Sequence, residues 1–162
     1  MEERGFARHL ISNEENVLLQ RLTQRGEKLL SSPRLAVFHH RRNSWAGIAL
    51  QAIKYGSGRA QNLLLLPETF RLLYFIPALF IFYLILLPFW LFLAGGASLL
   101  PLGCYVVLFL GSSIYFAIRD SDPAQLLGIG VAFCVHLSYG LGFIQAGIFW
   151  LRQRERLKEF WV

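Results

Sequence analysis

Residues 72–118 read LLYFIPALFIFYLILLPFWLFLAGGASLLPLGCYVVLFLGSSIYFAI. These 47 residues contain no charged side chain, and Arg71 and Arg119 bound them. One crossing of the hydrocarbon core of a bilayer needs about 20 apolar residues. The stretch therefore predicts two membrane helices, at about 70–94 and 99–118.

The turn between these helices is predicted at the sequence GGAS (residues 95–98), because two glycines and a serine loosen a helix where the chain must reverse. Downstream, the polar loop RDSDP (residues 119–123) precedes a further uncharged stretch at 124–151. Its glycines and polar side chains favour one crossing packed against the first two helices. A shallow or re-entrant segment bent near Gly140 is the alternative, since it would return the basic tail (residues 152–162) to the side of the amino terminus.

The composition indicates that two parts of the chain lie in different environments, one in the membrane and one in water. The whole chain is 55% hydrophobic, yet residues 1–66 are ordinary and polar. Residues 1–71 carry 11 Lys or Arg against 6 Glu, and the net charge of the chain is +6. A basic flank indicates the cytoplasmic face and contact with anionic lipids. No pattern typical of nucleic-acid binding accompanies this charge. We expect an integral membrane protein, of the bacterial inner membrane, whose polar segment is cytoplasmic.

Residues 1–44 predict one helix and two short strands. The helix begins near Asn13 and ends at Gly26, and the strands are expected at 28–30 and 35–38. So few elements bury too little apolar surface to fold alone. We therefore expect residues 1–44 to be the last part of a larger domain.

An amphipathic helix is predicted from Trp45, and residues 45–66 form the link to the membrane. The apolar residues share one face, and the sequence GSG (residues 56–58) is expected to end the helix. The apolar face is expected either in the lipid headgroup region, with Trp45 as an anchor, or on the missing part of the larger domain. The fold class is thus a mainly α membrane protein with a remnant of an α/β domain.

Four motifs then occur in order. They are NEENVLLQRL (residues 13–22), HHRRNS (39–44), YGSGRA (55–60) and HLSYGLGF (136–143). In this order they resemble the carboxy-terminal portion of a membrane-anchored family 2 glycosyltransferase of the exopolysaccharide or succinoglycan type. The resemblance implies a GT-A fold for the larger domain. It also implies transfer of a sugar from a nucleotide-sugar donor to a lipid-linked or glycan acceptor.

The resemblance assigns the acidic pair of the first motif to the general base. Glu15 occupies the position where the family usually has Asp, and Glu14 is the second candidate. An alcohol becomes a good nucleophile only when its proton is accepted as the new bond forms. Without the resemblance, the pair is explained by the preference of acidic residues for the start of a helix.

Basic residues are the candidates for binding the substrates. They are Arg21, His40, Arg42 and Arg59, while His39 is the candidate for a position beside the cofactor. The complete enzyme is expected to use Mg²⁺ or Mn²⁺, because a divalent metal and arginine both stabilise a leaving diphosphate. For the run HHRR (residues 39–42) the alternative is a solvated or lipid-facing basic patch. Arg59 is expected to reach either the phosphate of the acceptor or a lipid headgroup.

The donor side of the family is missing from this sequence. No Asp precedes Asp120, so the Asp-x-Asp metal site of the family has no counterpart in residues 1–119. The sequence DSD (residues 120–122) has the spacing but lies between membrane segments, and Pro123 is expected to start the next helix. We expect a fragment that binds no metal and is inactive alone.

Two other classes of function stay open. One is a small non-enzymatic membrane protein that binds a partner or anionic lipid. The other is a transporter subunit in which His136 and Gln145 line a polar pathway, although a single His in a membrane helix is more often a packing hydrogen bond.

Overall fold

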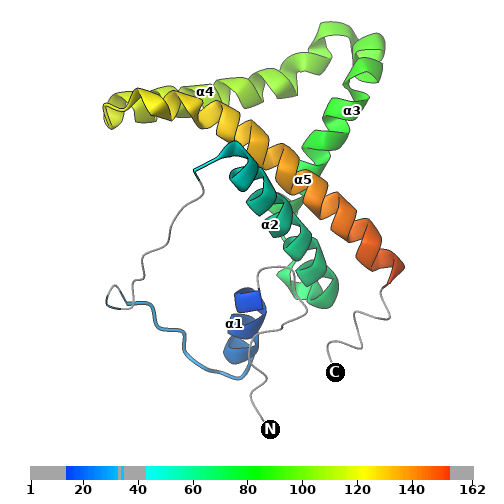
Figure 1. The fold of residues 1–162 in the computed structure, drawn as a ribbon. Coiled ribbons are helices and arrows are strands. Elements are labelled where there is room, and N and C mark those ends of the chain that lie inside the picture. Colours follow the sequence, from blue (N-terminus) through cyan, green and yellow to red (C-terminus); the bar gives the residue numbers. More distant parts are fainter. Residues whose placement is uncertain (1–13, 33, 35–42, 154–162) are drawn as a thin grey trace.

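The computed structural model describes residues 14–32, 34 and 43–153 (Figure 1). Within them the α-helices are α1 (Glu14–Gln24), α2 (Trp45–Leu65), α3 (Ile76–Ala94), α4 (Leu100–Arg119) and α5 (Gly128–Arg152). Short 3₁₀ helices connect them, namely η2 (Pro67–Thr69), η3 (Leu72–Phe75), η4 (Gly95–Leu99) and η5 (Pro123–Leu127). These residues contain no strand, which confirms the predicted mainly α fold.

Helix α1 ends where the sequence predicts. Gly26 has a φ of +82°, and the Glu27 amide donates to the Leu22 carbonyl at 3.0 Å, which closes the helix as a glycine cap does. The strand predicted at 28–30 is wrong, because no described segment pairs with these residues and a strand needs a partner for its backbone groups. The second predicted strand, at 35–38, lies outside the described residues.

Helix α2 is longer than the sequence predicts. Ser44 caps it, since its hydroxyl accepts from the Gly47 amide at 3.1 Å, and the helix continues to Leu65. The predicted break at residues 56–58 is wrong. These residues are buried, so the contact that they make with another helix offsets the low helix propensity of glycine.

That contact is with α5, which runs beside α2 and in the same direction (Figure 1). A Cβ at Gly56 would overlap the Tyr139 carbonyl oxygen, and a Cβ at Gly142 would overlap the Ile53 carbonyl oxygen. The two backbones therefore touch, as in small-residue packing between membrane helices. Part of the apolar face of α2 is covered by α5, so neither lipid nor a missing domain is needed to explain its burial there.

A buried hydrogen bond crosses the same interface. The Ser57 hydroxyl donates to the Gly142 carbonyl oxygen at 3.1 Å. We expect Ser57→Ala to lower the free energy of unfolding by about 1 kcal/mol, because a buried acceptor loses its donor. Chemical denaturation in detergent micelles measures the change. Ser112→Ala is the control, since the exposed Ser112 hydroxyl donates only to Leu108 of its own helix, and an equal loss in both variants would contradict the expectation.

The turn between α3 and α4 lies at the predicted residues. Helix α3 ends at Ala94, Gly95 has a φ of +56°, and α4 begins at Leu100. The Tyr83 hydroxyl donates to the Ser98 carbonyl at 2.7 Å and holds η4 against α3. The two helices leave η4 at an angle to one another (Figure 1).

Two apolar segments are long enough to cross a membrane. They are Leu72–Arg119, which contains α3 and α4, and Pro123–Arg152, which contains α5; little of each is buried inside the molecule. Helix α5 is continuous through Gly140, so the bend proposed there as an alternative is not observed. The helix is about 37 Å long at 1.5 Å per residue, which exceeds the hydrocarbon core.

The loop before α5 also follows the prediction. Asp122 caps η5 by accepting from the Ala124 amide at 3.0 Å, and Pro123 begins that helix. Arg119 donates to Asp120 at 2.7 Å, and this hydrogen bond lowers the pKa of the Asp120 carboxyl. A lowered pKa contributes stability above the unfolded-state value and loses it as the pH falls through the folded-state value.

We therefore expect the Asp120 carboxyl to titrate below its ordinary range in a detergent-solubilised sample. Because both side chains are exposed, the pair adds little to stability. Carboxyl NMR shifts recorded against pH measure the pKa, and Arg119→Gln should return it to the usual value. A pKa that the substitution leaves unchanged would contradict the assigned cause.

Candidate functional site

A pocket of about 410 Å³ lies where α1, α2, the start of α3 and α5 approach one another. Its lining combines two opposite charges, three phenol rings and two apolar side chains, contributed by Glu15, Tyr55, Arg59, Leu73, Tyr74, Pro77 and Tyr139. Two of the predicted site residues, Glu15 and Arg59, therefore meet in one pocket. The pocket is the candidate functional site.

Arg59 is the positive group of the pocket. Helix α2 carries it one residue after the buried Gly58, and the side chain is partly buried. The guanidinium carbon lies 4.2 Å from the centre of the Tyr74 ring, which is a cation–π contact. The Tyr139 side chain, from α5, lies beside the same guanidinium. Two rings from different elements therefore orient Arg59.

Glu15 supplies the negative group. It lies in the first turn of α1, where the helix dipole favours a carboxylate, and its side chain is exposed. A carboxylate in this place can accept a proton from a hydroxyl placed in the pocket. The position is compatible with the role that the resemblance gives to Glu15.

The other predicted residues lie elsewhere. Arg21 is in the last turn of α1 and does not line the pocket, although it has contacts of its own. Glu14 begins α1, but the structure does not describe its side chain. His39, His40 and Arg42 lie outside the described residues. Their predicted roles stay predictions.

Three tyrosines of the pocket received no role from the sequence. Tyr55 and Tyr139 belong to two of the four motifs, and that membership is the signal that could have singled them out. Tyr74 lies within the first apolar stretch, where one tyrosine among many aromatic residues carries no distinguishing pattern. Its role appears only when Arg59 is seen on its ring.

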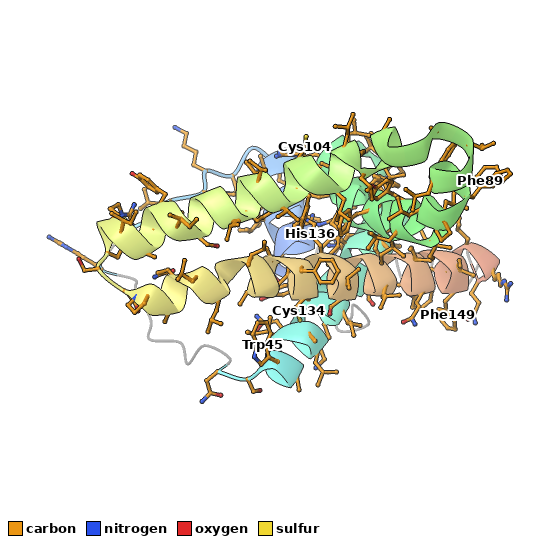
Figure 2. The ribbon with its side chains drawn as sticks, turned by 90° about the horizontal axis from the view of Figure 1, so that it is seen from above. Trp45, Phe89, Cys104, Cys134, His136 and Phe149 are labelled. Carbon is orange, nitrogen blue, oxygen red and sulfur yellow. The ribbon has the colours of Figure 1, made fainter. Side chains whose placement is uncertain are left out.

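His136 occupies a different place, between α4 and α5 (Figure 2). Its Nδ1 lies 2.8 Å from the Ala132 carbonyl oxygen and 3.4 Å from the Tyr105 hydroxyl. With a proton on Nδ1, the ring donates to the carbonyl. The rings of Phe80, Tyr105 and Phe109 surround it, with centroids 5.4 to 6.2 Å away. His136, on α5, therefore packs against side chains of α3 and α4.

The polar pathway considered for a transporter finds no support in this arrangement. His136 and Gln145 are nine positions apart on α5, which places them about 180° apart around the helix. Cys104 is exposed on α4 and Cys134 partly buried on α5. Both lie within helices.

No group of three His, Cys, Asp or Glu that could hold a metal ion occurs among residues 14–32, 34 and 43–153. The Glu15 carboxylate and the Arg59 guanidinium can supply acid–base and anion-binding chemistry in the pocket. A scan against protein-family models, a search of curated proteins and a search of solved structures found no match to this chain.

Proposed function

We propose that this chain is the acceptor-side and membrane-anchoring portion of a family 2 glycosyltransferase. The pocket that unites Glu15 with Arg59 carries the proposal. The first residue comes from the motif at 13–22 and the second from the motif at 55–60, and no local interaction requires these two segments to meet.

The packing of α2 on α5 adds to this support. The motif at 55–60 and the motif at 136–143 pack on each other through Gly56, the Tyr139 carbonyl and the hydrogen bond from Ser57 to Gly142. Three of the four motifs that resemble the family therefore contribute to one pocket and its supporting interface. This shared location of the motifs supports the proposal.

In the proposed reaction, Glu15 accepts the proton of the acceptor hydroxyl as that oxygen attacks the sugar. Glu is one methylene longer than the Asp usual in the family, so its carboxylate reaches about 1 Å further. The position of Glu15 in the first turn of α1, rather than within a packed core, leaves room for that difference. Arg59 holds an anionic part of the acceptor beside it.

The donor and its metal belong to the part of the enzyme that would precede residue 1. The described residues offer no set of side chains for a divalent metal, so no step here runs through one. In the proposed topology α3, α4 and α5 are the three crossings, and the polar segment before them is cytoplasmic. The crossings hold the pocket next to the bilayer, where a lipid-linked acceptor is found.

The test is an assay of sugar transfer in membranes that contain the gene product extended through its upstream coding region. We expect hydrolysis of a nucleotide sugar and transfer to a lipid fraction by the extended product, and neither by the present chain alone. An upstream region without an Asp-x-Asp, or an extended product without either activity, would overturn the proposal in favour of a small membrane protein that binds a partner or lipid.

A further inference from the structure

Arg59 is a partly buried cation with five N–H donors, and its side-chain hydrogen bond to Tyr139 uses fewer than all of them. The guanidinium carbon lies 4.2 Å from the centre of the Tyr74 ring, and the Tyr139 hydroxyl accepts a side-chain hydrogen bond from Arg59. The remaining N–H donors of the guanidinium lie in its plane and can reach a ligand in the pocket. Within the described part of the chain, no carboxylate forms an ion pair with Arg59. A cation held in this way favours an oxyanion that can bond to two of its donors.

The same pocket has an apolar side. Leu73 and Pro77 line it, and they belong to the first turns of the long apolar segment. Leu72 and Leu73 are 69% and 68% exposed, and Ile76 is 47% exposed. An apolar surface therefore leads from the pocket onto the side of α3 that would face lipid. A ligand with an anionic head and an apolar chain can use both surfaces at once.

We propose that this pocket binds the phosphate head of a membrane lipid, with Arg59 as the phosphate ligand and Tyr139 as the residue that positions it. The lipid chain lies along η3 and the start of α3. An ordinary anionic phospholipid and a lipid-linked acceptor present the same phosphate. The inference rests on the proposed function only where the bound lipid is taken to be the acceptor.

Glu15 makes one part of the pocket negatively charged, opposite in sign to Arg59. Its carboxylate lines the same pocket and repels a phosphate. The phosphate is therefore held at Arg59 and away from Glu15, and the space between them remains for a neutral group such as a sugar hydroxyl. Removing the negative charge at position 15 should strengthen phosphate binding, whereas it should abolish a reaction that needs a base.

The experiment measures binding to the full chain in a neutral detergent by titration calorimetry. Three probes separate the sources of affinity, namely dihexanoyl phosphatidic acid, inorganic phosphate and dihexanoyl glycerol. We expect phosphatidic acid to bind more tightly than either of the other two. Equal affinity for inorganic phosphate would overturn the lipid assignment, and equal affinity for the glycerol lipid would overturn the phosphate site.

Variants then test the named residues. Arg59→Gln should raise the Kd for phosphatidic acid about 10-fold or more, because it removes charge-assisted hydrogen bonds. Arg59→Lys should be intermediate, since it keeps the charge but not the fork of donors. Arg119→Gln is the matched control, because Arg119 also contacts an aromatic ring at the end of an apolar helix, 4.6 Å from Phe116. Equal losses for Arg59→Gln and Arg119→Gln would show non-specific charge attraction and overturn the site.

Two further variants keep the test decisive should Arg59→Gln fail to fold. Tyr139→Phe retains the ring and removes only the hydroxyl, and we expect the Kd to rise about 3-fold. Glu15→Gln should lower the Kd about 2- to 3-fold. An unchanged Kd in both would contradict the proposed arrangement.

The failures of the two proposals can be told apart. If Glu15→Gln binds phosphatidic acid more tightly while transfer is never observed, the lipid site stands and the transferase proposal fails. If transfer depends on Glu15 while Arg59→Gln leaves lipid binding unchanged, the lipid site fails and the transferase proposal stands.

Discussion

Glu15→Gln is expected to reduce sugar transfer by the upstream-extended product about 10²- to 10⁴-fold, because the attacking hydroxyl loses its proton acceptor. Gln is nearly the same size as Glu and keeps hydrogen-bonding capacity, so the pocket should retain its shape. Initial rates of transfer from a radiolabelled nucleotide sugar, measured in isolated membranes, give the change.

Two comparisons sharpen this result. Glu15→Asp places the residue usual in the family at this position, and it should retain far more activity than Glu15→Gln. Glu27→Gln is the matched control, since Glu27 is an exposed Glu just after α1 that does not line the pocket. Full activity in Glu15→Gln, or an equal loss in Glu27→Gln, would remove Glu15 from the role of base.

Gly142→Ala is expected to lower the free energy of unfolding by about 3 kcal/mol, the upper part of the usual range for overpacking. The added Cβ would overlap the Ile53 carbonyl oxygen, and backbone atoms cannot move aside as a flexible side chain can. The helices must separate, which also weakens the hydrogen bond from Ser57. Gly56→Ala should behave alike, because its Cβ would meet the Tyr139 carbonyl oxygen. Denaturation in detergent micelles, followed by circular dichroism, measures both.

Gly147→Ala is the matched control on the same helix. A Cβ at Gly147 would meet no atom within 4 Å. Alanine is the better helix former by about 0.5–1 kcal/mol. This variant should therefore be as stable as the unsubstituted chain or slightly more stable. Equal destabilisation in Gly147→Ala and Gly142→Ala would mean that the close contact between α2 and α5 does not set the stability of this helix pair.

Because Tyr139 lies on α5 and Arg59 on α2, these glycine variants should also affect the pocket. Separation of the helices moves the Tyr139 side chain away from the Arg59 guanidinium. The extended product carrying Gly142→Ala should thus lose transfer even under conditions where it stays folded. This coupling follows from the interface and not from any contact of Gly142 with substrate.

The features that the sequence predicts well depend on neighbouring residues alone. The apolar stretch at 72–118, the turn at 95–98 and the end of α1 at Gly26 each follow from the length of an uncharged run or from the conformational freedom of glycine. Both properties act within a few residues. The structure places the turn and the end of α1 where these signals predict them, whereas α3 begins at Ile76 and not near residue 70, because the 3₁₀ helix η3 precedes it.

Predictions that needed a distant partner were less successful. The strand at 28–30 requires a neighbouring strand, which no described segment supplies. The break at residues 56–58 treats glycine as a helix breaker, and that holds only where nothing packs against it. In the tertiary structure Gly56 lies against the backbone of α5, and the contact stabilises the helical conformation that the local sequence disfavours.

The sequence by itself determined the apolar helices, the turn between them and the identity of Glu15 and Arg59 as candidates, since these depend on composition and on short motifs. Only the tertiary structure decided that α2 packs on α5 and that both candidates line one pocket with Tyr74 and Tyr139. The reason is that such contacts depend on which faces of the helices meet, and this depends on packing between residues far apart in the chain.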